Sequence, residues 1–227
     1  MNRAYASSSL NDAQDNLGQV IHFAVNECHY DLDEFVSGFS GTVIAYHFEH
    51  DRYVICEKTG IELFFDICEA TGKHLKSKEP DDYTLDYSPE YWTGMILATY
   101  QWYSGLSFFT INQVIKASKI RDLFDPFHEA DITKSLEYLD QIFLRDKKET
   151  YLQYYRENFL YSISDISRIT KIPVEILKKC EIMSDKPLIN SLSGNELHSL
   201  AKLFKCKIDD LLEYIPEPIR KDEFYYS

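Results

Sequence analysis

Four regularly spaced isoleucines near the C-terminus constrain the fold of this chain more than any other feature. Ile163, Ile166, Ile169 and Ile172 recur every three residues, which keeps their side chains along one flank of a short helix and its exit. Pro173 follows a polar turn and suits the first position of a second helix, where its missing N–H carries no penalty. The pattern therefore predicts two short helices joined by a tight turn.

A further helix is predicted after the next loop. Residues 193–196 (SGNE) have the capping-box pattern, in which serine and glutamate side chains bond the free N–H groups at a helix start. Apolar residues at helical spacing continue to Phe204, and the segment closes at Glu213. Leu177 and Cys180 can pack back from the second helix onto the first. These helices together predict a helix-turn-helix fold, for which the default function is sequence-specific DNA binding.

Residues 161–213 resemble the Cro/Xre-type domain of bacterial regulators, both in these helices and in the closing run LAKLFKCKIDDLLE. The resemblance implies that residues 173–181 form a recognition helix for double-stranded DNA, and a homodimer would combine two half-sites. Family geometry gives base-edge or phosphate contacts to the lysines, a cytosine contact to the glutamate, and phosphate contacts to the serine and asparagine. The implied DNA-contacting residues are Ser162, Val174, Glu175, Lys178, Lys179, Lys186 and Asn190.

Several positions depart from the pattern of that family. Ile163 stands where relatives commonly have glutamine, and Lys171 stands where they commonly have glycine. Val174 places an apolar group where the groove-facing side is usually polar, and Ile176 is a second candidate for such a position. Apolar groups lose little by meeting a protein and cannot pair with base edges. An alternative is therefore a protein-interaction module, an antitoxin or adaptor, that keeps the fold without binding DNA.

Two upstream segments carry a second resemblance. SPEYWTGMILATYQWYSGLSF (88–108) and FHEADITK (127–134) resemble an uncharacterised all-helical region fused to such domains in bacterial, mainly Gram-positive, proteins. Some of those proteins belong to toxin–antitoxin-like loci beside an ADP-ribosyltransferase-like toxin. The resemblance implies an antitoxin-type autorepressor whose N-terminal domain binds a protein partner, such as a toxin of that kind.

The acidic residues of the chain are concentrated in its N-terminal part. The net charge of the whole chain is −13. Residues 1–148 contain thirteen basic and twenty-four acidic residues, whereas residues 149–213 contain nine basic and ten acidic residues. Because a negative surface repels nucleic acid at long range, the N-terminal part is expected to bind protein and the C-terminal part DNA.

The periodicity of the N-terminal part predicts an all-α fold. We expect helices over about 10–26, 32–39, 59–70, 88–105 and 129–145, and a short one capped by Ser107. Residues 73–87 form a charged loop. The expected domains are a disordered tail (1–9), an acidic all-helical partner-binding domain (10–145), a helix-turn-helix domain (149–215) after a charged hinge, and a tail (216–227).

Aromatic residues are dense between positions 91 and 109. Interfaces are enriched in tryptophan and tyrosine, so we predict partner contacts by Trp102, Tyr103 and Phe109. The competing interpretation is core packing. Helical spacing favours it for Tyr103, which lies on the apolar stripe of the predicted helix, whereas Trp102 lies off that stripe. Packing is the stronger general explanation for this segment.

Other patterns argue against an enzyme, a metal site or a cofactor. The five cysteines form no CxxC pair, and the chain has no P-loop, GxGxxG, HExxH or GxSxG motif. His47 and His50 lack a third ligand at a telling distance, and the acidic residues after His128 suit a helix start. With no membrane-length apolar run and no signal peptide, a cytoplasmic location is expected.

Overall fold

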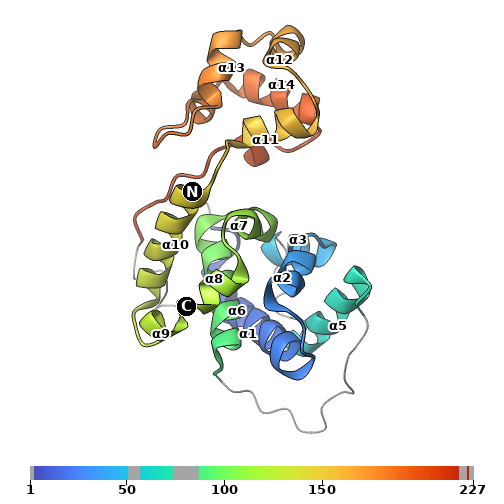
Figure 1. The fold of residues 1–227 in the computed structure, drawn as a ribbon, viewed down its shortest axis with the longest axis vertical. Helices are drawn as coiled ribbons and strands as arrows, with labels where there is room; N and C mark the ends of the chain where they lie inside the picture. The colour runs from blue at the N-terminus through green and yellow to red at the C-terminus, as the bar shows by residue number, and fades with distance from the viewer. Residues whose placement is uncertain (1–2, 51–56, 74–86, 220–223, 225–227) are drawn as a thin grey trace. The chain divides into compact units, whose positions relative to one another are not determined.

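The computed structural model describes residues 3–50, 57–73, 87–219 and 224, and every regular element within these ranges is helical (Figure 1). The all-α prediction is confirmed. The chain divides into two compact units, an N-terminal unit of Met1–Asp146 with Glu217–Ser227, and a C-terminal unit of Lys147–Pro216. The predicted charged loop 73–87 lies outside the described residues, apart from its two end positions.

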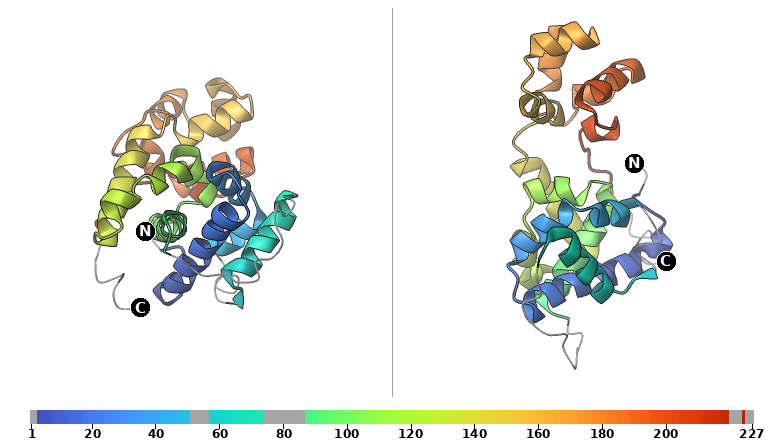
Figure 2. Two further views of the ribbon diagram at one scale, coloured as in Figure 1. Left: turned by 60° about the horizontal axis from the view of Figure 1, so that its bottom comes forward. Right: turned by 90° about the vertical axis from the view of Figure 1, so that its right-hand side faces the viewer.

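Two long helices form the centre of the N-terminal unit. Helix α1 (Leu10–His22), extended by a π-helical turn (Phe23–Glu27), lies beside α6 (Pro89–Ser104) in Figures 1 and 2. Their backbones approach closely because glycines lie at the contact, and a Cβ atom on Gly94 would lie 2.3 Å from the carbonyl oxygen of Leu17. Any larger residue at Gly94 would therefore push the two helices apart.

The remaining helices of this unit surround that pair. Side chains at the N-caps of α2, α5, α6 and α7 accept hydrogen bonds from the first turn, as their sequences predict. Helix α3 was not predicted, although the hydroxyl of Thr42, directly before it, accepts a 3.2 Å hydrogen bond from the N–H of Ala45 in its first turn. The helices are α2 (Leu32–Ser40), α3 (Val43–His50), α5 (Gly60–Thr71), α7 (Phe108–Val114), α8 (Ala117–Arg121), α9 (Phe124–Phe127) and α10 (Ile132–Asp146).

Residues 3–9 differ from the prediction of a disordered tail. The indole Nε1 of Trp102 donates a 2.8 Å hydrogen bond to the carbonyl of Tyr5, and the guanidinium of Arg3 lies over the Trp102 ring. A 3-10 turn (Ser7–Ser9) leads into α1. These contacts use backbone groups and one long side chain, which a polar sequence does not reveal.

The predicted tail 216–227 also begins differently. The hydroxyl of Tyr103 donates a 2.6 Å hydrogen bond to the carbonyl of Glu217, and the rings of Trp102 and Phe224 meet edge to face. The chain therefore returns to the N-terminal unit after completing the C-terminal one.

The C-terminal unit contains four α-helices around one apolar core. They are α11 (Tyr151–Asn158), α12 (Ile163–Thr170), α13 (Val174–Cys180) and α14 (Gly194–Phe204), with 3-10 turns at Leu188–Ser191 and Asp209–Leu211. Of the four isoleucines that predicted this fold, Ile166 and Ile172 are buried, Ile163 packs against the core, and Ile169 is exposed. The spacing was a correct guide to the helices although one of its residues faces solvent.

Candidate DNA-binding surface

Helix α12 begins with a complete capping box. The Ser162 hydroxyl accepts a hydrogen bond from the backbone N–H of Asp165 (3.1 Å) and donates one to the Asp165 carboxylate (2.6 Å). This bond and the nearby Arg168 guanidinium hold the pKa of Asp165 below its ordinary value. A phosphate contact by the Ser162 hydroxyl therefore competes with its capping role.

The turn between α12 and α13 depends on a lysine in a conformation that favours glycine. Lys171 has φ 64°, in the left-handed region, and its N–H closes α12 on the carbonyl of Ser167 at 2.9 Å. Pro173 then occupies the N-cap of α13, one position earlier than predicted. The helix predicted to be the recognition helix spans Val174–Cys180, shorter than the predicted 173–181.

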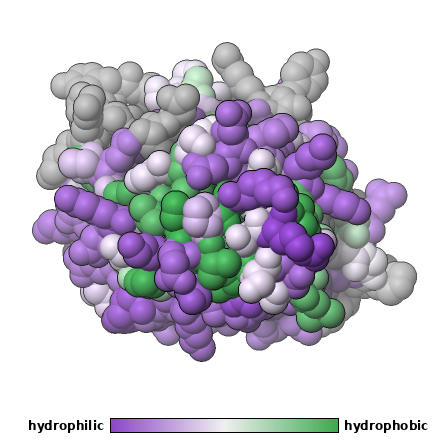
Figure 3. All heavy atoms as spheres, turned by 90° about the horizontal axis from the view of Figure 1, so that it is seen from above, coloured by the Kyte–Doolittle hydropathy of each residue, from purple (hydrophilic) through white to green (hydrophobic). Residues whose placement is uncertain are grey.

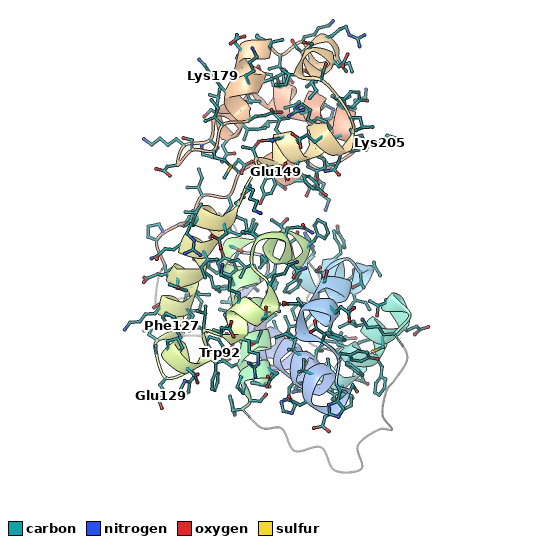
Figure 4. All side chains as sticks on the ribbon, viewed as in Figure 1. Trp92, Phe127, Glu129, Glu149, Lys179 and Lys205 are labelled. Atoms are coloured by element: carbon teal, nitrogen blue, oxygen red, sulfur yellow. The ribbon has the colours of Figure 1, made fainter. Side chains whose placement is uncertain are left out.

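The solvent-facing side of α13 is formed by charged residues. Glu175, Lys178 and Lys179 are exposed, and the ammonium of Lys178 lies 3.2 Å from the carboxylate of Glu175 (Lys179 is labelled in Figure 4). Val174 is half-buried, and Ile176 packs against the core. Three hydrogen-bonding side chains therefore share one exposed helix with one partly exposed apolar group.

Most acidic residues of the C-terminal unit bond groups of the unit itself. Glu181 binds the guanidinium of Arg156 at 2.6 Å, Glu213 pairs with Lys147, and the Asp165 and Glu196 carboxylates complete capping boxes. Residues 147–216 hold eleven basic and ten acidic residues, a net charge of +1. Several of these contacts pair an acid with a base of the same unit, and on α13 itself Lys178 is paired with Glu175.

Two further predicted contacts lie after α13. Lys186 is exposed in the loop that follows α13. The side chain of Asn190 already has hydrogen-bond partners within the unit. Its amide nitrogen donates to the carbonyl of Glu213, and its amide oxygen accepts from the N–H of Glu213, both at 2.8 Å. The structure gives this side chain a part in holding the C-terminal end of the unit.

Two of the three predicted partner-binding residues are buried. Trp102 and Tyr103 are 1% and 2% exposed, because α6 is covered around nearly its whole circumference. That prediction was wrong for both, and the competing interpretation of core packing was correct. Phe109, on α7, is 42% exposed and stays a candidate.

The histidines singled out in the sequence have local roles. The Nδ1 atoms of His50 and His128 lie 2.9 Å from the carbonyl oxygens one turn earlier, and each ring stacks on an aromatic neighbour. The described part of the chain contains no group of three or more His, Cys, Asp or Glu side chains that could hold a metal ion. Among its helices, none has the length and apolarity needed to cross a membrane.

Lys171 was not among the predicted DNA contacts and was noted only as a departure from glycine. It lies exposed at the turn immediately before α13. A basic residue in the turn of a predicted helix-turn-helix is the sequence signal that makes it a further candidate.

Helices α12 and α13 are joined by a tight turn and pack on each other, and α12 also packs on α14, an arrangement that defines a helix-turn-helix fold. Residues 154–217 match the family of the Cro/C1-type HTH DNA-binding domain. No curated protein and no solved structure matches the chain. The C-terminal unit is thus a Cro/C1-type helix-turn-helix domain of the kind found in transcription regulators, and this part of the predicted resemblance is confirmed.

Proposed function

We propose that this protein represses transcription by binding an operator in its own upstream DNA as a homodimer. The observation that supports this most directly is the exposed row Glu175, Lys178 and Lys179 on α13, within a domain whose family binds DNA. A helix of this length reaches few base pairs, so two copies on adjacent half-sites would supply the missing contacts. Lys171 and Lys186 would add phosphate contacts on either side of α13.

Selection from a pool of random-sequence duplexes tests sequence-specific binding without assuming an operator. We expect the full chain to enrich one motif with an inverted repeat, as a symmetric dimer requires. Enrichment of a motif without a repeat would contradict the dimer alone, and failure to enrich any motif at low salt would contradict sequence-specific binding.

A protein-interaction role for the C-terminal unit is the second candidate. Figure 3 shows apolar side chains gathered among hydrophilic ones on the face of the molecule that is turned toward the viewer. Ile169, Ile182 and Met183 are exposed apolar residues of this unit. Exposed apolar groups favour a protein contact. Under this alternative the protein would be an antitoxin or adaptor, and the charged side of α13 would be dispensable.

An antitoxin role also fits the first proposal, since one protein can repress its operon and bind a toxin. The support for a protein partner is the net charge of the N-terminal unit, which has thirteen basic and twenty-seven acidic residues. A toxin with a basic active surface, such as an ADP-ribosyltransferase-like protein, would complement it. Co-expression with the product of the neighbouring gene, followed by purification of a complex, tests this role.

A further inference from the structure

Helix α11 ends at a leucine whose backbone conformation favours glycine. Leu160 has φ 55°, in the left-handed region, and its N–H bonds the carbonyl of Glu157 at 3.1 Å. The N–H of Tyr161 bonds the carbonyl of Arg156 at 3.0 Å, which completes a Schellman motif. A bulky side chain raises the energy of this conformation, whereas glycine adopts it freely. The end of the helix therefore does not explain why a leucine occupies this position.

The side chain of Leu160 is also almost entirely in solvent. It is 91% exposed, so its burial adds almost nothing to the stability of the unit. Four other described helices end in the same left-handed conformation with glycine or lysine, at Gly72, Gly105, Lys171 and Lys205. Glycine fits the conformation and lysine suits exposure, whereas leucine suits neither. A strained, exposed apolar residue is an observation that points to a contact with another molecule.

Two aromatic rings flank this leucine and are held in place from below. The rings of Phe159 and Tyr161 are nearly parallel (3°), with centroids 6.4 Å apart, and both contact the buried ring of Phe204 on α14. Phe159 is 41% exposed and Tyr161 is half-buried. We call Phe159, Leu160 and Tyr161 the α11-end patch. Because Phe204 fixes its rings before any partner arrives, the entropic cost of binding there is reduced.

The shape of the α11-end patch is self-complementary. Under two-fold symmetry a surface of one copy meets the same surface of its partner, so residue i contacts j and residue j contacts i. The projecting Leu160 of each copy can therefore pack on the Phe159 and Tyr161 rings of the other copy. Such a contact buries the exposed leucine twice.

The charges of the chain favour a second copy as the occupant of the patch. The N-terminal unit has a net charge of −14, so two N-terminal units repel each other, whereas the C-terminal unit has +1. Next to the patch, Arg156 is paired with Glu157 at 3.1 Å and with Glu181 at 2.6 Å. The patch therefore attracts through apolar burial, and its neighbours do not select a partner of opposite charge.

We propose that the α11-end patch is the contact through which two copies of this chain associate. The proposal rests on the homodimer of the proposed repressor and names the surface that forms it. None of the three residues is a predicted DNA contact, so the exposed side of α13 stays available to DNA. Because the patch is small, association is weak, with a dissociation constant on the order of tens of micromolar.

Sedimentation velocity of the full chain without DNA, at concentrations up to about 300 μM, tests the proposal. Leu160→Gly and Leu160→Asn remove the apolar side chain, and both replacements tolerate the left-handed conformation. Leu160→Met keeps an apolar side chain of similar size. Ile169→Ser is the matched control, because Ile169 is an exposed apolar residue (47%) near the C-terminal end of α12.

We expect the unsubstituted chain to dimerise, and Leu160→Gly and Leu160→Asn to weaken dimerisation at least about tenfold, since each dimer loses two leucine contacts. Leu160→Met and Ile169→Ser should change it by less than about twofold. The unfolding temperature of Leu160→Gly should not decrease, because glycine relieves the strained conformation. Loss of the dimer in this variant would therefore not result from unfolding.

A chain that stays monomeric at about 300 μM would overturn the proposal and leave the patch to a different protein. Dimerisation of Leu160→Gly with unchanged affinity would also overturn it, as would loss of the dimer in Ile169→Ser alone. DNA binding is measured separately. A chain that dimerises through Leu160 but selects no DNA sequence would contradict the repressor function and leave this contact standing.

Discussion

The ammonium group of Lys147 and the carboxylate of Glu213 form a buried ion pair that joins the beginning and the end of the C-terminal unit. The second Glu213 oxygen accepts a 2.6 Å hydrogen bond from the N–H of Tyr151, and Asn190 bonds both backbone groups of Glu213. Burial lowers the pKa of Lys147, and the Glu213 charge opposes that effect. The pair closes the domain where the chain enters and leaves it.

Breaking this pair from one side should destabilise the C-terminal unit strongly. Lys147→Met leaves the Glu213 carboxylate buried without its counter-charge, for which we expect a loss of about 3 kcal/mol or more. Hydrogen exchange of the α12 and α14 amides measures it. Lys147→Met combined with Glu213→Gln should recover part of the loss, because no unpaired charge remains. If Lys147→Met alone leaves exchange unchanged, the pair contributes nothing to stability.

Replacement of Lys171 by glycine should stabilise the same unit. Lys171 has φ 64° and Lys205 has φ 55°, a conformation that costs a non-glycine residue energy and glycine almost none. We expect Lys171→Gly to gain about 0.5–1 kcal/mol after the entropic penalty of glycine in the unfolded chain. Thermal unfolding reports the change. Lys202→Gly, in the interior of α14, should have the opposite sign and lose about 1 kcal/mol.

Acid should weaken the helix starts of this unit. Hydrogen bonds from the Ser193 hydroxyl and N–H hold the pKa of Glu196 below its ordinary 4.5, and a similar box with Arg168 lowers that of Asp165. Because the folded pKa values are depressed, these groups stabilise the unit fully above the ordinary pKa, and the stabilisation is lost as pH falls through the folded value. The midpoint temperature of thermal unfolding should therefore decrease as the pH is lowered below about 4.5. Glu196→Gln keeps the capping geometry without a titrating group, and an identical pH profile for this variant would contradict the assignment.

The charged side of α13 should account for DNA affinity. Lys178→Ala with Lys179→Ala should abolish sequence preference, and it should reduce the slope of log affinity against log salt by about 1 for each phosphate that is no longer neutralised. Lys202→Ala with Lys205→Ala is the matched control, since it removes the same charge from α14 and its C-cap (Lys179 and Lys205 are labelled in Figure 4). Gel-shift titrations of both variants provide the comparison. An equal decrease in the DNA affinity of the two double variants would indicate a non-specific effect of charge. The interaction of the Lys178→Ala, Lys179→Ala variant with a protein partner should remain intact.

The elements of the C-terminal unit could be predicted because their signals are local. Ser162, Ser193 and Pro173 mark helix starts through bonds within one turn, and the structure contains each start within one residue of its prediction. The capped helices of the N-terminal unit, such as α5 after Thr59, were predictable for the same reason.

Burial and side-chain partners depend on contacts distant in sequence. Trp102 lies off the apolar stripe of its own helix, yet the segment Arg3–Tyr5 covers it from almost a hundred positions away (Trp102 Nε1 to the Tyr5 carbonyl, sequence separation 97). An asparagine side chain can bond a phosphate, which is why Asn190 was predicted to do so. Its hydrogen bonds with Glu213 join residues 23 positions apart and are visible only in the three-dimensional structure. The carboxylate of Glu49 on α3 accepts a hydrogen bond from the N–H of Phe108 on α7, 59 positions away, and no local pattern connects these two residues.

Fluorescence anisotropy across a salt series tests most directly whether the C-terminal unit binds a specific DNA sequence. The purified full chain is titrated with a labelled duplex from its own upstream region and with a scrambled duplex of the same composition. We expect tighter binding to the upstream duplex at every salt concentration, with affinity falling steeply as salt rises. Weak binding to both duplexes, with no preference at any salt concentration, would contradict the account and favour a helix-turn-helix fold kept for protein contacts.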